Sequence, residues 1–138
     1  MILIIEDSGI ERKEIREALE KSGRQVLEAI NAEEALEVVR SKGENIKLIL
    51  LDVMMAPGNL FTLKETQGGL RTGEFLVFKL RRYFMKKPIV AITARKDIGE
   101  LKDMIGEVVD VFIRKPVLEK EVVRVVDALL GKSQSGVR

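Results

Sequence analysis

Cysteine and histidine are both absent from this 138-residue chain. The lack of cysteine excludes disulfide bonds, thiolate metal sites and thiol nucleophiles. The lack of histidine excludes imidazole acid–base catalysis, histidine-bound zinc and any role as a phosphohistidine donor. The side chains that remain for chemistry are carboxylates, hydroxyls, lysine and arginine.

The chain also lacks a long apolar run and a strong net charge. No apolar stretch approaches the length of a membrane span, and no basic stretch precedes the apolar residues that begin at position 2. The formal net charge is only +2, so neither nucleic acid nor a membrane is favoured as a partner. We therefore expect a single soluble, cytoplasmic domain, which suits a chain of this length.

Short apolar runs alternate with segments of helical period along the chain. The runs predict five strands, at residues 2–5, 25–29, 48–52, 89–93 and 111–113. Ser8 caps the first predicted helix, Gly23 ends it, and Asn31 caps the second. Three more helices are expected, at about 73–85, 98–105 and 118–129. This alternation predicts an α/β fold with a doubly wound, five-stranded parallel sheet in the order 2-1-3-4-5, the flavodoxin-like arrangement.

Two stretches fall outside this pattern. We assign residues 1–131 to the domain and expect residues 132–138, which are short and polar, to be a disordered tail. Residues 56–72 form a longer connection than a strand and a helix usually need. We treat this segment as a loop inserted into the domain.

Acidic residues end two of the predicted strands. Glu6 and Asp7 follow the first strand, and Asp52 closes the third. The predicted order sets these strands side by side, so the three carboxylates should meet at one edge of the sheet. Two like charges about 4 Å apart cost on the order of 4 kcal/mol at an effective dielectric constant of about 20, which a bound cation relieves. An all-oxygen ligand set favours Mg²⁺, with phosphate chemistry on the metal.

The fourth and fifth predicted strands end in groups that suit phosphoryl transfer. Thr93 supplies a hydroxyl, and the small residue Ala94 after it lets a phosphoryl group approach. Lys115 follows the fifth strand and can reach the same edge of the sheet. An ammonium and a hydroxyl can hold phosphoryl oxygens while a carboxylate oxygen of Asp52 attacks phosphorus.

Together these strand ends resemble the response-regulator receiver domain of two-component signalling systems. The resemblance covers nearly the whole chain and rests on the motifs Ile4-Ile5-Glu6-Asp7-Ser8, Leu50-Leu51-Asp52-Val53-Met54-Met55, Ile92-Thr93-Ala94 and Lys115-Pro116. It implies that Asp52 is phosphorylated by a partner histidine kinase or phosphotransfer protein. It also implies that Glu6, Asp7, Asp52 and the backbone carbonyl of Met54 surround Mg²⁺.

The resemblance further implies a conformational switch. Thr93 and Lys115 would bind the phosphoryl oxygens, and Phe112 occupies the position of the aromatic residue that rotates inward on activation. Phosphorylation adds a charge of about −1.5 to −2, which would draw Thr93 inward and free space for Phe112. The Lys115-Pro116 peptide bond is cis in similar proteins.

The expected function is phosphorelay signalling, in which the phosphorylated receiver controls an unidentified partner protein and is not a turnover enzyme. We expect a stand-alone monomer or weak dimer, although a piece of a longer protein would have the same sequence. Two alternatives stay open: a receiver-like binding module that is not phosphorylated, and a phosphatase with Asp52 as nucleophile. Such phosphatases commonly place a second aspartate two residues further on, where this chain has Met54.

The 56–72 segment departs from similar receivers, which reach a helix-starting glycine soon after the phosphoacceptor. Here that glycine is Gly73, and Leu60 and Phe61 make the intervening segment too apolar for a plain linker. Our hypothesis is that the segment folds over the site or forms a partner surface, with Lys64 or Arg71 able to contact phosphate. The alternative is a surface insertion held by its own apolar contacts.

Overall fold

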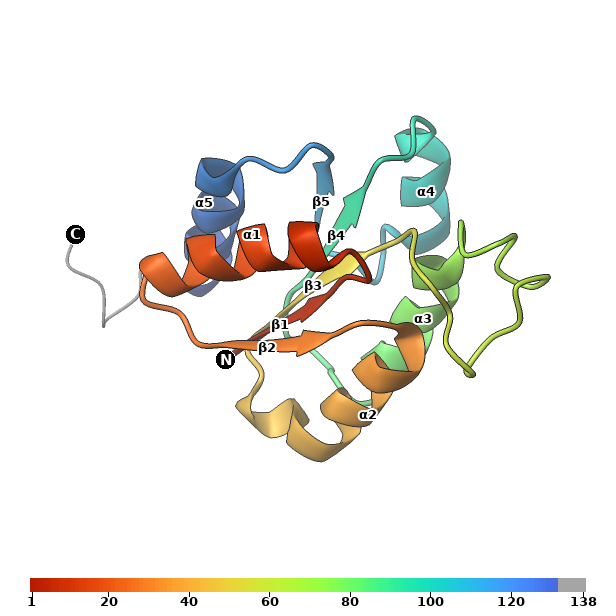
Figure 1. The fold of residues 1–138 in the computed structure, drawn as a ribbon, viewed down its shortest axis with the longest axis horizontal. Helices are drawn as coiled ribbons and strands as arrows, with labels where there is room; N and C mark the ends of the chain where they lie inside the picture. Colours follow the sequence, from red (N-terminus) through yellow and green to blue (C-terminus); the bar gives the residue numbers. More distant parts are fainter. Residues whose placement is uncertain (132–138) are drawn as a thin grey trace.

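A five-stranded parallel sheet forms the centre of the computed structural model, which describes residues 1–131 (Figure 1). The strands are β1 (Ile2–Ile5), β2 (Val26–Ala29), β3 (Leu48–Asp52), β4 (Ile89–Thr93) and β5 (Val111–Arg114). They pair in the order β2-β1-β3-β4-β5, and every pair is parallel. The predicted fold class and strand order are therefore confirmed.

Each strand is followed by an α-helix, and a short 3-10 turn, η1 (Gly43–Asn45), lies between the second helix and β3. The helices are α1 (Gly9–Lys21), α2 (Ala32–Lys42), α3 (Thr72–Arg81), α4 (Ile98–Ile105) and α5 (Glu119–Leu130). The two predicted caps are present, since Ser8 Oγ accepts from the amide of Glu11 at 3.3 Å and Asn31 Oδ1 accepts from the amide of Glu34 at 2.8 Å.

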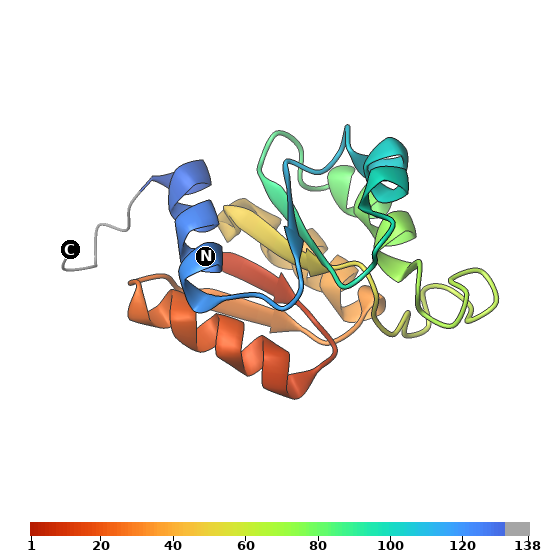
Figure 2. The same ribbon diagram turned by 90° about the horizontal axis from the view of Figure 1, so that it is seen from above.

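The helices cover both faces of the sheet (Figure 2). The side chains between helices and sheet form two apolar cores. Alternate residues of a strand point to opposite faces, so β1 contributes to both cores. Its Ile2 and Ile4 pack with α1 and α5, whereas Leu3 and Ile5 pack with α2, α3 and α4. Because β1 and β3 are buried on both faces, the carboxyl edge is where their chemistry can reach solvent.

One helix end differs from the sequence prediction. We expected the third helix to run to residue 85, but α3 ends at Arg81. The Arg81 guanidinium donates to the carbonyls of Phe84 at 3.0 Å and Val108 at 2.9 Å, and Phe84 is buried. The chain therefore turns inward at this point, because tertiary contacts outweigh the helical pattern of the sequence.

Two expectations concern membranes and the tail. Within residues 1–131, no helix combines the length and the apolar character that crossing a bilayer requires. The predicted tail at residues 132–138 lies outside the described residues.

Candidate functional site

Three carboxylates meet at the carboxyl edge of the sheet, where β1 and β3 end side by side. One oxygen each from Glu6, Asp7 and Asp52 lies within 4.8 Å of the others. Glu6 and Asp52 are each 2% exposed, whereas Asp7 is exposed. The strand register accounts for the meeting, because Ile5 pairs with Leu51 and the next residue of each chain segment is an acid.

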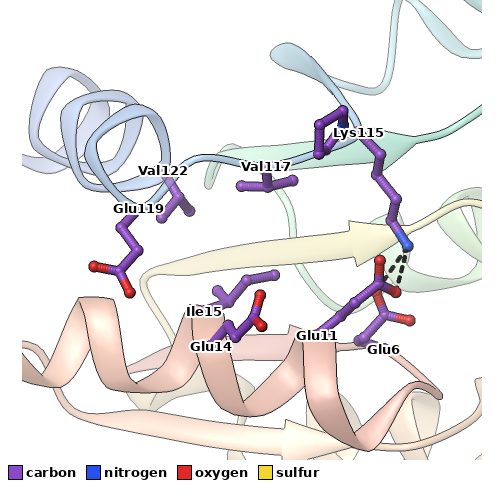
Figure 3. A pocket seen from close by; sticks show the side chains of 9 residues that line it. Glu6, Glu11, Glu14, Ile15, Lys115, Val117, Glu119 and Val122 are labelled. Carbon is purple, nitrogen blue, oxygen red and sulfur yellow. Dashed lines mark hydrogen bonds and ion pairs between the residues drawn. The ribbon is translucent and has the colours of Figure 1, made fainter.

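The ammonium group of Lys115 is the counter-ion of this cluster. Its Nζ donates to Glu6 Oε1 at 3.1 Å and to Glu11 Oε2 at 2.9 Å (Figure 3), and to Asp52 Oδ2 at 3.2 Å. These three acceptors engage all three N–H groups of the lysine. The Lys115-Pro116 peptide bond is cis, as the resemblance implied.

Burial makes the two inner carboxylates hold a proton more tightly than usual. The pKa of Glu6 is raised to about 9, first because burial disfavours its charged form and then because Asp52 lies beside it. The pKa of Asp52 is also raised by burial, against the opposing effects of hydrogen bonds from Glu6 and Lys115. Near neutral pH, the metal-free pair therefore retains a proton that an isolated carboxylate would lose.

Burial acts on the pKa of the Lys115 ammonium in the opposite direction, but here it does not decide the outcome. Burial works to lower its pKa, but the hydrogen bond to Glu11 and the charges of Asp52 and Glu6 outweigh burial and raise it. Lys115 is therefore a permanent positive charge at the sheet edge.

The donor set fits a hard divalent cation. All three carboxylate groups offer oxygen, and the sequence contains no histidine or cysteine that would favour a softer metal. A cation in place of the retained proton would relieve the repulsion between Glu6 and Asp52. Mg²⁺ suits this cluster because it uses few protein ligands and keeps positions for water or phosphate oxygens.

Two backbone amides fix the segment that follows β3. The amide of Met54 donates to Asp52 Oδ1 at 3.0 Å, and the amide of Ala56 donates to Asp7 Oδ2 at 3.0 Å. Both carboxylates therefore organise the chain that carries the Met54 carbonyl. This local order places residues 53–56 around the acidic cluster.

Glycines at the end of the inserted segment press against the same stretch of chain. The amide of Gly73 donates to the carbonyl of Val53 at 2.8 Å, and a Cβ on Gly73 would lie 2.5 Å from Val53 Cα. Gly69 has a φ of +95°, and a Cβ there would lie 2.9 Å from the Met55 carbonyl oxygen. Thr72 Oγ1 donates to that carbonyl at 2.6 Å. The start of α3 thus sets the path of the chain beyond the site.

The two residues of the predicted switch lie on neighbouring strands. Thr93 is fully buried one residue beyond Ile92, the pairing partner of Asp52, and its Oγ1 accepts from the amide of Arg95 at 3.0 Å. Phe112 is partly buried against the core formed with α4, and the Nζ of Lys102 lies 5.8 Å from its ring centroid. The structure places Thr93 near the carboxylates and the Phe112 ring against α4.

Sequence reasoning missed Glu11 as a partner of Lys115. Glu11 lies on the first turn of α1 and lines a pocket of about 100 Å³ between α1 and the start of α5 (Figure 3). The buried Ile15 lies one turn further along α1 and lines the same pocket. The spacing of four residues between Glu11 and the apolar Ile15 was the sequence signal that could have indicated this placement.

The inserted segment is anchored to α3. Leu60 and Phe61 pack against the core, and the rings of Phe61 and Phe75 lie 5.8 Å apart. Arg71 is paired with Glu74, and Lys64 is exposed. The hypothesis that the segment covers the site or contacts phosphate stays a prediction.

The fold and this site define a class of protein: a doubly wound α/β domain with an acidic pocket and a lysine at the carboxyl edge of its sheet. Residues 2–127 match the family described as response regulator receiver domain, and the chain belongs to that family. The predicted family membership is therefore confirmed.

Relatives of known sequence carry a similar segment within longer chains. The chain is 32% identical over 116 residues to a cyclic di-GMP phosphodiesterase of Thermotoga maritima, covering 84% of this chain and 27% of the relative. It is 31% identical over 121 residues to an osmosensing histidine protein kinase of Saccharomyces cerevisiae, covering 84% of this chain and 9% of the relative. The chain thus spans about a quarter or less of these relatives.

Solved structures share the fold at lower sequence identity. The receiver domain of NtrX from Brucella abortus superposes with a TM-score of 0.76 at 22% identity, covering 96% of this chain and 100% of that domain. Chemotaxis protein CheY4 of Vibrio cholerae also gives a TM-score of 0.76 at 22% identity, covering 94% of this chain and 97% of CheY4. These likenesses support the same arrangement of sheet and helices.

Proposed function

We propose that this receiver domain accepts a phosphoryl group on Asp52 from a phosphohistidine of a partner histidine kinase or phosphotransfer protein. The observation that carries the proposal is the setting of Asp52, a 2% exposed carboxylate with Lys115 Nζ 3.2 Å from Oδ2 and the Met54 amide 3.0 Å from Oδ1. The phosphohistidine must come from outside these 138 residues, because they contain no histidine.

In the proposed reaction, an Asp52 carboxylate oxygen forms a bond to phosphorus while the bond between phosphorus and the donor's imidazole nitrogen breaks. The electron pair of the broken bond stays on the imidazole. Lys115 stabilises the negative charge on the phosphoryl oxygens, because its ammonium already lies at Asp52. No acid stands two residues after Asp52, where Met54 is found, so turnover of phosphate monoesters is not favoured.

The acidic cluster supports Mg²⁺ as the cofactor. Glu6, Asp7, Asp52 and the backbone carbonyl of Met54 would hold the ion. When bound, it supplies positive charge that offsets the carboxylates and the phosphoryl oxygens. The raised pKa of Glu6 supports this assignment, since it indicates that, without a metal, the charge of Lys115 does not offset the burial of Glu6 and the nearby Asp52.

The proposed output is a conformational change that controls a partner protein. A phosphoryl group on Asp52 would attract the Thr93 hydroxyl, and the space released beside β4 would admit the Phe112 ring. Thr93 is one residue beyond the partner of Asp52 on β4, the strand next to β3, and Phe112 pairs with Ala91 of β4 from β5, one strand further from Asp52. We propose action in the cytoplasm, as a monomer or weak dimer and without direct nucleic-acid binding.

Phosphorylation by a small donor tests the proposal directly. The protein is incubated with acetyl phosphate and Mg²⁺ and analysed by intact mass spectrometry. The expected result is one added phosphoryl group in the wild type and in Asp103→Asn, an exposed control on α4, and none in Asp52→Asn or with EDTA. Labelling of Asp52→Asn to the wild-type extent would contradict the assignment, and a lack of labelling in the wild type would favour the non-phosphorylated binding module.

A further inference from the structure

A second cluster of charges lies outside the carboxylate site and is centred on Glu74. This residue is in the first turn of α3 and is 2% exposed. Its Oε2 accepts from Arg71 Nε at 2.8 Å and forms an ion pair with Arg95 Nη1 at 3.0 Å. Its other oxygen, Oε1, is buried and accepts no hydrogen bond from any residue within the described range 1–131. A buried carboxylate in this setting depends on its two guanidinium partners.

Arg95 connects this cluster to the Thr93 hydroxyl. The backbone amide of Arg95 donates to Thr93 Oγ1 at 3.0 Å, while its side chain, 9% exposed, reaches Glu74. The Nε of Arg95 also donates to Asp97 Oδ1 at 2.9 Å, at the start of α4. The Arg95 side chain thus links the residues between β4 and α4 to α3. A displacement of Thr93 toward Asp52 would pull on Arg95.

Arg71 connects the same carboxylate to the inserted 56–72 segment. The amide of Arg71 donates to the carbonyl of Thr66 at 2.9 Å, and its guanidinium lies 5.4 Å from the ring centroid of Phe75. That ring packs against Phe61 of the segment. The segment lies beside the N-terminal end of α3, as its yellow-green trace shows in Figures 1 and 2.

We propose that Glu74 is a positioning residue that couples the loop after Thr93 to the inserted 56–72 segment. The coupling follows from charge. If Arg95 moves with the loop, Glu74 is left buried with Arg71 as its remaining partner, so the carboxylate and Arg71 must adjust together. The inserted segment then changes its contacts whenever the site is phosphorylated, which makes it a surface that reports the state of Asp52. This inference rests on the proposed function, because it requires Thr93 to respond to the phosphoryl group.

Hydrogen exchange measured by mass spectrometry tests the coupling. The full chain is compared with and without Mg²⁺ and beryllium fluoride, a non-covalent mimic of the phosphoryl group. In the wild type, we expect the mimic to change exchange in peptides that cover 93–97 and also in peptides that cover 60–71. In Glu74→Gln, which keeps the side-chain shape and removes the charge, the response at 93–97 remains and the response at 60–71 is lost.

Two further variants separate coupling from a loss of folding. Arg71→Gln removes the link from the segment's side, at a residue that is less buried than Glu74, and should also lose the 60–71 response alone. Glu37→Gln, an exposed change on α2, should behave as the wild type. A wild-type 60–71 response in both link variants would overturn the inference, as would a wild type that responds only at 93–97. A wild type that responds in neither region would overturn the proposed function, and the coupling with it.

Discussion

Neutralising Glu6 should stabilise the metal-free protein, although the substitution replaces a buried carboxyl group that accepts a hydrogen bond from Lys115. The pKa of Glu6 is raised from 4.5 to about 9, with burial as the first cause and Asp52 as the second. The folded state therefore binds a proton that the unfolded state has lost at neutral pH. This contribution to stability is fully present below pH 4.5 and is lost progressively as the pH rises toward 9.

The size of the effect follows from the interval between 4.5 and the working pH. At about 1.4 kcal/mol per pH unit, keeping Glu6 protonated at pH 7 costs the wild type about 3 kcal/mol relative to a side chain that does not titrate. Glu6→Gln should thus be more stable than the wild type by about 3 kcal/mol at pH 7 and by less than about 1 kcal/mol at pH 5.

Urea unfolding in EDTA at pH 5, 6 and 7 measures this difference. The control is Glu14→Gln, an exposed change on α1 that should stay within about 0.5 kcal/mol of the wild type at every pH. Equal stability of Glu6→Gln and the wild type at pH 7 would refute the reasoning. A difference that does not grow with pH would refute it as well, because it would show that the titration of Glu6 is not its source.

Three further predictions concern the metal, the chain beyond Asp52 and the lysine. Mg²⁺ binding should release about one proton per ion near neutral pH, a number that calorimetry in buffers of different ionisation enthalpy measures. The affinity for Mg²⁺ should therefore rise with pH, and an affinity independent of pH would contradict the shared proton. Gly73→Ala should destabilise the fold by about 1–3 kcal/mol in urea unfolding, because the added Cβ would lie 2.5 Å from Val53 Cα. This loss should outweigh the better helix propensity of alanine, and an unchanged unfolding midpoint would show that the contact relaxes freely. Lys115→Gln should lower the rate of acetyl phosphate labelling at least about tenfold while the fold persists by circular dichroism, and a wild-type rate would exclude the lysine from the reaction.

The sequence predicted the sheet well because its strands are short and strongly apolar. Leu3 and Ile5 on one face and Ile2 and Ile4 on the other leave no polar side for β1, as expected of a buried parallel strand. The order of the strands then placed Glu6 next to Asp52 without any side-chain information. The predicted end of α3 was wrong by several residues, because the contact of Arg81 with the distant carbonyl of Val108 has no local signal.

The charge networks could not be predicted in the same way. Arg71 and Glu74 are only three residues apart, but the rest of α3 and the strand β4 separate Glu74 from Arg95. Their pairing depends on how α3 packs beside the loop after β4. The partnership of Glu11 with Lys115 likewise joins residues 104 positions apart. Sequence periodicity indicates which face of an element is buried, but it does not specify which charges meet across elements.

The most direct test of the account is to locate the phosphoryl group chemically. Sodium borohydride reduces an aspartyl phosphate to homoserine, and trypsin should release residues 48–64 as one peptide because Lys47 and Lys64 flank it. After treatment with a phosphodonor and Mg²⁺, we predict homoserine at position 52 and none when Mg²⁺ is removed. Unreduced Asp52 in a labelled sample, or reduction at Glu6 or Asp7, would contradict the central claim that the buried Asp52 carboxylate accepts phosphorus.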